Sequence, residues 1–104
     1  MEILHINTDN FESEVLASPV PVLLDFFATW CGPCRALAPV LQQVADEVPG
    51  IRVAKVDVDE APALAEKFGI MTVPTLLVIR DGVELRRASG VRPKAAVISL
   101  IFGE

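Results

Sequence analysis

The chain is poor in cysteine and histidine, the side chains that hold most structural zinc ions. Its 104 residues include two cysteines and one histidine. A structural zinc site needs about four ligands, usually cysteine pairs or histidines at short spacing. Cys31 and Cys34 have only His5 to join them. A single chain therefore cannot complete such a site, and the metal hypothesis that remains is a dimer bridging two cysteine pairs. We expect no metal and no tightly bound cofactor.

Positive charge is also scarce. The chain has nine lysines and arginines against 14 aspartates and glutamates, which gives a net charge of -5. Binding to a nucleic-acid backbone needs clustered basic side chains that displace counterions. Here the basic residues are scattered, apart from Arg86 and Arg87. The composition thus argues against a nucleic-acid partner.

Long apolar runs are absent as well. No run reaches the about 18 residues of a membrane-spanning helix. Residues 1–5 lack the basic start, apolar core and cleavage site of a signal peptide. We therefore expect no membrane partner and a cytoplasmic location. Thiols are kept mostly reduced in that compartment, so a lone Cys-x-x-Cys pair there is more often catalytic than structural.

The segment that stands out is Trp30-Cys31-Gly32-Pro33-Cys34, which lies between an apolar run and a helical pattern. Cysteines three positions apart on a first helical turn are neighbours and can close a disulfide with little backbone movement. Cys31 would face the unpaired N–H groups and positive dipole of the helix start, which favour a thiolate. Cys34 lies one turn inside. The spacing predicts a redox pair in which Cys31 attacks and Cys34 resolves.

The residues around the pair fit this interpretation. Gly32 has no side chain, so another polypeptide can approach the sulfur of Cys31. Pro33 suits a first helical turn, where its missing N–H would have no partner in the helix. We interpret Trp30 as a partly exposed contact residue.

Two charged residues interrupt apolar strand patterns. Asp25 lies within residues 22–28, and Lys55 lies within residues 51–58. Burying a carboxylate is costly unless its pKa rises or it finds a partner. The alternatives are a strand-end Asp25 that reaches water and a Lys55 whose tip is exposed while its stem covers apolar surface.

The rest of the chain alternates strand and helix patterns. We expect a short edge strand over residues 3–6 and a helix capped by Asp9 and Asn10. The clearest helix follows the cysteines, has Pro39 inside it, and ends at Pro49. Further strands are predicted over residues 22–28, 51–58, 75–80 and 83–88, with a hairpin turn at 81–82, and further helices over 59–68 and 93–102. This order predicts a single α/β domain, 1–104, with a mixed sheet and helices on both faces.

The motif and its surroundings resemble the thioredoxin family. Besides Trp-Cys-Gly-Pro-Cys, the family landmarks in the expected order are Asp25, Pro39, Lys55, Val73-Pro74-Thr75 and Gly90. The resemblance covers nearly the whole chain. It implies the thioredoxin fold, a central mixed five-stranded sheet with four helices packed on both faces. One departure is Phe27, where many thioredoxins have tryptophan; Phe27 is not a reacting group, so the chemistry should survive.

The resemblance also implies a function. Family members reduce disulfide-containing target proteins and act as electron carriers, so thioredoxin reductase is the implied electron donor and a monomer the implied state. By resemblance, Asp25 helps to take the proton of Cys34, Lys55 lies close to Asp25 beneath the pair, and the Val73-Pro74 bond is cis. The implied target-binding residues are Trp30, Gly32, Pro33, Val73, Pro74, Gly90 and Val91. A further hypothesis is a docking module whose redox chemistry is secondary.

Overall fold

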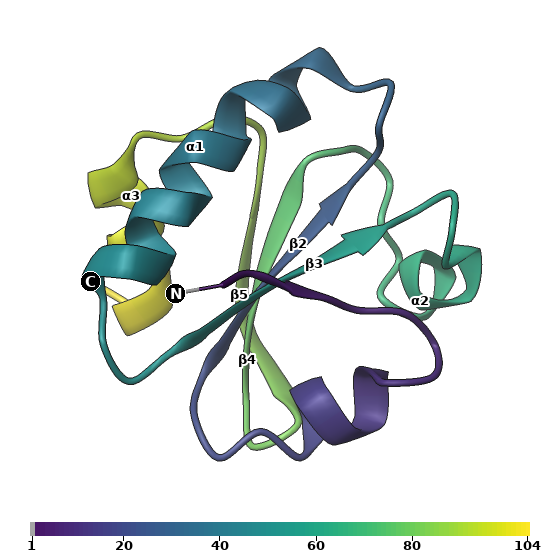
Figure 1. Ribbon diagram of the computed structural model, residues 1–104, viewed down its shortest axis with the longest axis horizontal. Coiled ribbons are helices and arrows are strands. Elements are labelled where there is room, and N and C mark those ends of the chain that lie inside the picture. The colour runs from purple at the N-terminus through teal and green to yellow at the C-terminus, as the bar shows by residue number, and fades with distance from the viewer. Residues whose placement is uncertain (1) are drawn as a thin grey trace.

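A computed structural model describes residues 2–104 and contains a mixed five-stranded sheet in the order β1-β3-β2-β4-β5 (Figure 1). Strands β1, β3 and β2 are parallel, whereas β4 runs antiparallel to β2 and β5 antiparallel to β4. The strands are β1 (Leu4–His5), β2 (Val22–Phe27), β3 (Arg52–Asp57), β4 (Thr75–Arg80) and β5 (Val83–Ser89). The predicted strand pattern, including the short edge strand, is confirmed.

Helices cover both faces of this sheet. Within residues 2–104 there are four helical segments: η1 (Glu12–Leu16), α1 (Gly32–Glu47), α2 (Pro62–Lys67) and α3 (Lys94–Phe102). Figure 1 shows α1 and α3 on one side of the sheet, with α2 and the short purple helix on the other. The predicted thioredoxin fold is therefore confirmed. No helix among the described residues has the length and apolar character needed to cross a bilayer.

The central strand β2 explains why two layers of helix are needed. Its side chains alternate between two cores, because successive residues of a strand point to opposite faces. Leu24 and Phe26 pack with residues of η1 and α2, and Leu23 packs with residues of α1 and α3. A strand buried on both faces reads as a continuous apolar run, as residues 22–28 do.

The start of the first helix differs from the prediction. Its N-cap residue is Phe11, which makes no side-chain capping bond. The Oδ1 atom of Asn7 instead accepts hydrogen bonds from the N–H groups of Asp9 and Asn10, at 2.8 Å and 3.2 Å. Oδ1 of Asn10 accepts from the N–H of Asn7. The prediction that Asp9 and Asn10 cap this helix is therefore wrong. The side chains of Asn7 and Asn10 close the preceding turn instead.

The other local signals are found where the sequence placed them. Pro39 lies inside α1, which continues to Glu47. The hairpin between β4 and β5 turns at Asp81 and Gly82, with φ angles of 53° and 77°. Two successive residues with positive φ are typical of the type I′ turn, whose twist matches that of paired strands.

Candidate redox site

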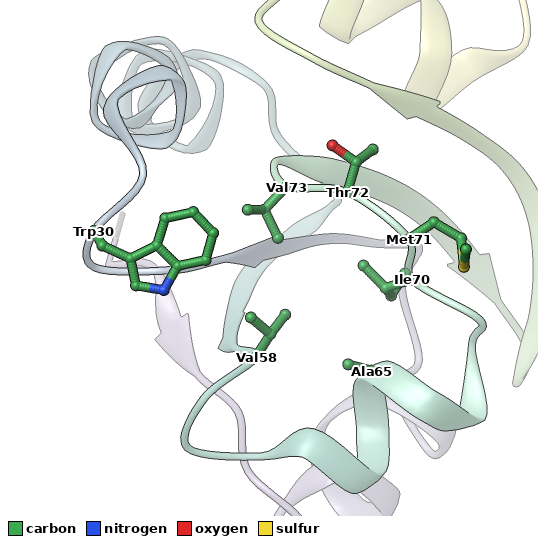
Figure 2. A pocket seen from close by; sticks show the side chains of 7 residues that line it. All are labelled: Trp30, Val58, Ala65, Ile70, Met71, Thr72 and Val73. Atoms are coloured by element: carbon green, nitrogen blue, oxygen red, sulfur yellow. The ribbon is translucent and has the colours of Figure 1, made fainter.

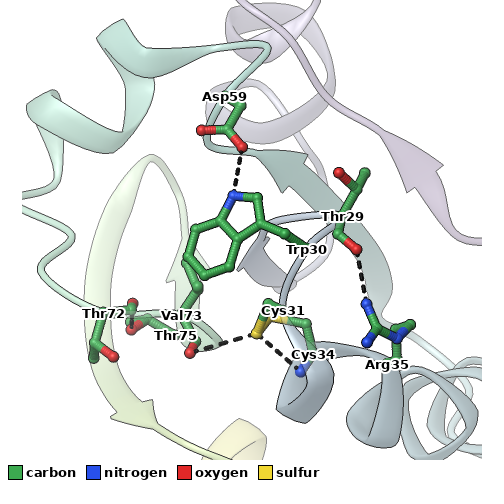
Figure 3. Close-up of a disulfide and its surroundings, with 9 residues drawn as sticks. All are labelled: Thr29, Trp30, Cys31, Cys34, Arg35, Asp59, Thr72, Val73 and Thr75. Atoms are coloured by element: carbon green, nitrogen blue, oxygen red, sulfur yellow. Dashed lines mark hydrogen bonds between the residues drawn. A yellow bond between two sulfur atoms is a disulfide. The ribbon is translucent and has the colours of Figure 1, made fainter.

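The two cysteines form a disulfide at the start of α1, with Cα atoms 5.3 Å apart (Figure 3). Cys31 is the N-cap residue, and its Sγ accepts a hydrogen bond from the N–H of Cys34 at 3.1 Å. A backbone donor aimed at this sulfur stabilises the thiolate once the bond is reduced. Pro33 occupies the first turn. The predicted placement of the pair on a first helical turn is confirmed.

Beside Cys31 lies the loop that leads into β4. The carbonyl oxygen of Val73 is 3.7 Å from Cys31 Sγ, so the thiol of the reduced form can donate to it (Figure 3). The Val73-Pro74 peptide bond is cis, as the resemblance implied. Pro74 is itself buried, whereas Val73 is only half-buried. The N–H of Gly90 donates to the carbonyl of Pro74 at 2.9 Å, which brings Gly90 next to this loop.

An apolar pocket of about 330 Å³ opens on this side of the disulfide (Figure 2). Its lining residues carry no charge: Trp30, Val58, Ala65, Ile70, Met71, Thr72 and Val73. The Trp30 side chain is 68% exposed, which confirms the prediction that it is accessible. Its indole N–H donates to Asp59 at 2.9 Å. Gly32 and Pro33 are exposed too, as is Val91. Trp30, Gly32, Pro33 and Val91 thus form an accessible surface of uncharged residues around Cys31, with the Asp59 carboxylate at its edge.

On the other side of the disulfide lies a buried acid. Asp25 is in the middle of β2 and only 2% exposed, so the alternative of a strand-end carboxylate in water is wrong. Its Oδ1 accepts no hydrogen bond from any residue in 2–104. Burial raises the pKa of Asp25 from 3.8 to about 7, and the positive charge of Lys55 opposes that rise. The expected buried carboxyl group with a raised pKa is thus present.

Neighbouring strands bring Lys55 to this acid. Lys55 of β3 is the register partner of Asp25 on β2, so the two strands are neighbours as the resemblance implied. The Lys55 side chain is half-buried, and its ammonium lies 4.7 Å from the centre of the Phe27 ring. A second pocket, of about 250 Å³, is lined by Asp25, Phe27, Ala28, Thr29, Cys34, Arg35, Ala38 and Lys55. Asp25, Lys55 and Cys34 therefore share one cavity.

Sequence reasoning missed two polar contacts of this site. Asp59 was assigned only to a helix start, yet it accepts the hydrogen bond of Trp30, 29 residues away in the sequence. Arg35, which no sequence pattern singled out, donates from Nη1 to the carbonyl of Thr29 at 2.8 Å. No local sequence pattern predicts either contact, because each depends on how one segment of the chain packs against another. Among the described residues, no three or more His, Cys, Asp or Glu side chains gather in a group that could hold a metal ion.

Comparison with known proteins adds a family to this geometry. The thioredoxin family model matches residues 2–102. A thioredoxin of Haemophilus influenzae is 44% identical over 101 residues, covering 96% of this chain and 94% of the relative. A thioredoxin of Chlamydia muridarum is 42% identical over 96 residues and covers 92% of both chains. One of Streptomyces clavuligerus is 43% identical over 94 residues, covering 90% of this chain and 88% of the relative.

Proposed function

The chain belongs to the thioredoxin family and is a protein-disulfide oxidoreductase, and for this activity we propose that Cys31 is the attacking thiol and Cys34 the resolving thiol. The observation that carries this proposal is the hydrogen bond from the Cys34 N–H to Cys31 Sγ at the helix start. It favours the thiolate of Cys31, which is the form that attacks a disulfide. Cys31 also adjoins the exposed Gly32, where a target can approach.

In the first proposed step, the Cys31 thiolate attacks one sulfur of the target disulfide. A bond forms between Cys31 Sγ and that sulfur, the target S–S bond breaks, and the other target sulfur leaves as a thiolate that takes a proton from water. In the second step, Cys34 gives its proton to the Asp25 carboxylate and attacks Cys31 Sγ. The bond between Cys31 Sγ and the target sulfur breaks, and that sulfur leaves as a thiolate that takes a proton from water. The target leaves with two thiols, and the pair is left as the disulfide of this structure.

Asp25 suits the second step because of its place and its pKa. It lines the same pocket as Cys34, and a pKa of about 7 lets it exist in both protonation states near neutral pH. A general base works best when its pKa lies near the operating pH. Lys55, opposite Asp25 on the next strand, supports the ionised form of that carboxyl group.

The target would lie across the uncharged surface around Cys31. We assign contacts with it to Trp30, Gly32, Pro33, Val73, Pro74, Gly90 and Val91; for Pro74, which is buried, the contact is through its place in the loop. An extended target segment could pair with the backbone of Val73 as an added strand, which gives affinity with little dependence on target sequence. The 3.7 Å between Val73 O and Cys31 Sγ supports this, since a segment paired there reaches the reacting sulfur.

The family implies disulfide-containing targets and a reductase partner. The finer proposals are a thioredoxin reductase as electron donor, action as a monomer, and a cytoplasmic location, where such thiol pairs are kept reduced. A coupled assay with NADPH, a thioredoxin reductase and a disulfide-bonded protein tests the first of these. Turnover that needs all three components and this chain supports the proposal. NADPH oxidation that does not increase when this chain is added would contradict it.

A further inference from the structure

Lys55 is held by an aromatic ring. Its ammonium lies 4.7 Å from the centre of the Phe27 ring, over the face of that ring. The ring face carries partial negative charge and attracts a cation at this distance. Among residues 2–104 no carboxylate lies within 4.0 Å of the Lys55 ammonium as an ion-pair partner. The Phe27 ring is therefore a direct contact of this ammonium.

The strand register explains why the ring can act on the acid. Lys55 on β3 lies opposite Asp25, and Phe27 lies two residues further along β2 on the same face of the sheet as Asp25. All three line the pocket of about 250 Å³ that also contains Cys34 and Arg35. The charged or titratable groups facing this pocket are thus Asp25 from β2, Lys55 from β3, and Cys34 and Arg35 from α1.

We propose that Phe27 is a positioning residue, whose ring holds the Lys55 ammonium beside Asp25 and so sets the pH range in which Asp25 accepts the proton of Cys34. This rests on the role of Asp25 proposed above. Lys55 is a flexible side chain, and its charge opposes the effect of burial on Asp25 only while it remains close. Without the ring, the ammonium would spend more time in water, and the pKa of Asp25 would rise.

A double-mutant cycle tests this proposal. The pKa of Asp25 is measured by NMR titration of its carboxyl carbon in wild type, Phe27→Leu, Lys55→Gln and the double variant. The disulfide form is used, because neither cysteine titrates in that form. Phe27→Leu removes the ring and keeps an apolar side chain, so it also changes the packing around Asp25. The Lys55→Gln background reports that packing effect alone.

We expect Phe27→Leu to raise the pKa of Asp25 by about half a unit when Lys55 is present. In the Lys55→Gln background the same substitution should change the pKa only by the packing effect, so the rise should be about half a unit smaller than with Lys55 present. Phe27→Trp, which restores a ring that attracts cations more strongly, should give a pKa no higher than that of wild type. Equal shifts in both backgrounds would overturn the proposal, since the ring would then act by burial alone.

The kinetic consequence is measured on the reduced protein. A rise of half a unit from about 7 should slow the resolving step about twofold at pH 7 in Phe27→Leu and shift its pH profile to higher pH. The titrations could show the expected pKa difference while Asp25→Asn leaves the rate of the resolving step unchanged. That result would contradict the proposed role of Asp25 as proton acceptor, but not the proposal that Phe27 positions Lys55.

If Phe27→Leu does not fold, NMR of the wild-type protein still tests whether the Phe27 ring lies over the Lys55 ammonium. A ring held over the ammonium shifts the NMR signals of the neighbouring Lys55 methylene protons upfield. Signals at ordinary positions would overturn the proposal.

Discussion

The two sides of the disulfide differ in polarity: apolar residues lie beside Cys31, and charged residues lie beside Cys34. On the side of Cys31 an apolar pocket is lined by uncharged residues, and Trp30 at its edge is 68% exposed. On the side of Cys34 a second pocket contains two charged residues, Asp25, which is 2% exposed, and the half-buried Lys55. An open apolar surface can bind another polypeptide, whereas a buried acid can hold a proton near neutral pH. The two sulfur atoms of one bond thus have environments suited to two different steps.

The largest difference between the two sides should appear when each cysteine is replaced by serine, because the two substitutions should block different steps. Cys31→Ser should lower disulfide reduction by about a thousandfold or more, because the attacking thiolate is lost. Cys34→Ser should still attack but stop as a stable mixed disulfide, because no thiol resolves it. Mass spectrometry after mixing with a disulfide protein measures this adduct. Preferential alkylation of Cys34 over Cys31 at mildly acidic pH would reverse the assignment.

Removing the buried acid should affect the Cys34 side alone. Asp25→Asn should slow the resolving step near neutral pH by about a hundredfold, while the attack by Cys31 keeps its rate. Stopped-flow measurement of both phases separates the two steps. Asp9→Asn, at an exposed position before η1, is the matched control and should change neither phase. Equal slowing of both phases would contradict the division between the two sides.

The same acid should make stability fall with pH. The pKa of Asp25 is about 7 in the folded chain and 3.8 ordinarily, so the folded state binds the extra proton between these values. Stability is then fully present below about pH 4 and is lost as pH rises through 7, by about 4 kcal/mol for three pKa units. Asp25→Asn should be more stable than wild type above pH 7, by up to that amount. Urea unfolding at pH 4 and pH 8 measures the difference, and an equal change at both pH values would contradict it.

Removing the exposed indole of Trp30 should weaken target binding without affecting Asp25 and Cys34. Trp30→Ala should lower kcat/KM for a disulfide protein about tenfold, as expected for a central aromatic contact. The rate with a small disulfide should change little, because a small molecule does not need the pocket. Phe102→Ala, an exposed aromatic position at the end of α3, is the control. A loss of equal size with both substrates would show that Trp30 acts on the sulfur chemistry.

The smallest effect should come from the contact that fixes the indole. Asp59→Ala removes the acceptor of the Trp30 N–H and should lower kcat/KM for the disulfide protein about threefold, in line with one exposed hydrogen bond. Asp59→Asn keeps an acceptor oxygen and should retain most of the activity. If both variants behave alike, the charge of Asp59 matters rather than the hydrogen bond.

Some features were readable from the sequence because they depend on neighbouring residues. The disulfide follows from Cys31 and Cys34 being three positions apart at a helix start. The buried strand around Asp25 follows from an apolar run with no alternation, and the hairpin follows from Asp81-Gly82. The failed helix caps show the limit of such signals. Asn7 and Asn10 bond to each other's backbone, and the local sequence allows that arrangement as readily as a cap.

The sequence alone determined which residues could react and where helices and strands would form, since spacing and periodicity act over a few residues. Only the tertiary structure decided what those residues meet. Trp30 finds Asp59 across 29 positions, and Asp25 meets Lys55 because β2 and β3 are parallel neighbours in that register. The distance between an ammonium and an aromatic ring, and the burial that raises a carboxyl pKa, arise when separate segments pack together. They have no local sequence signature for that reason.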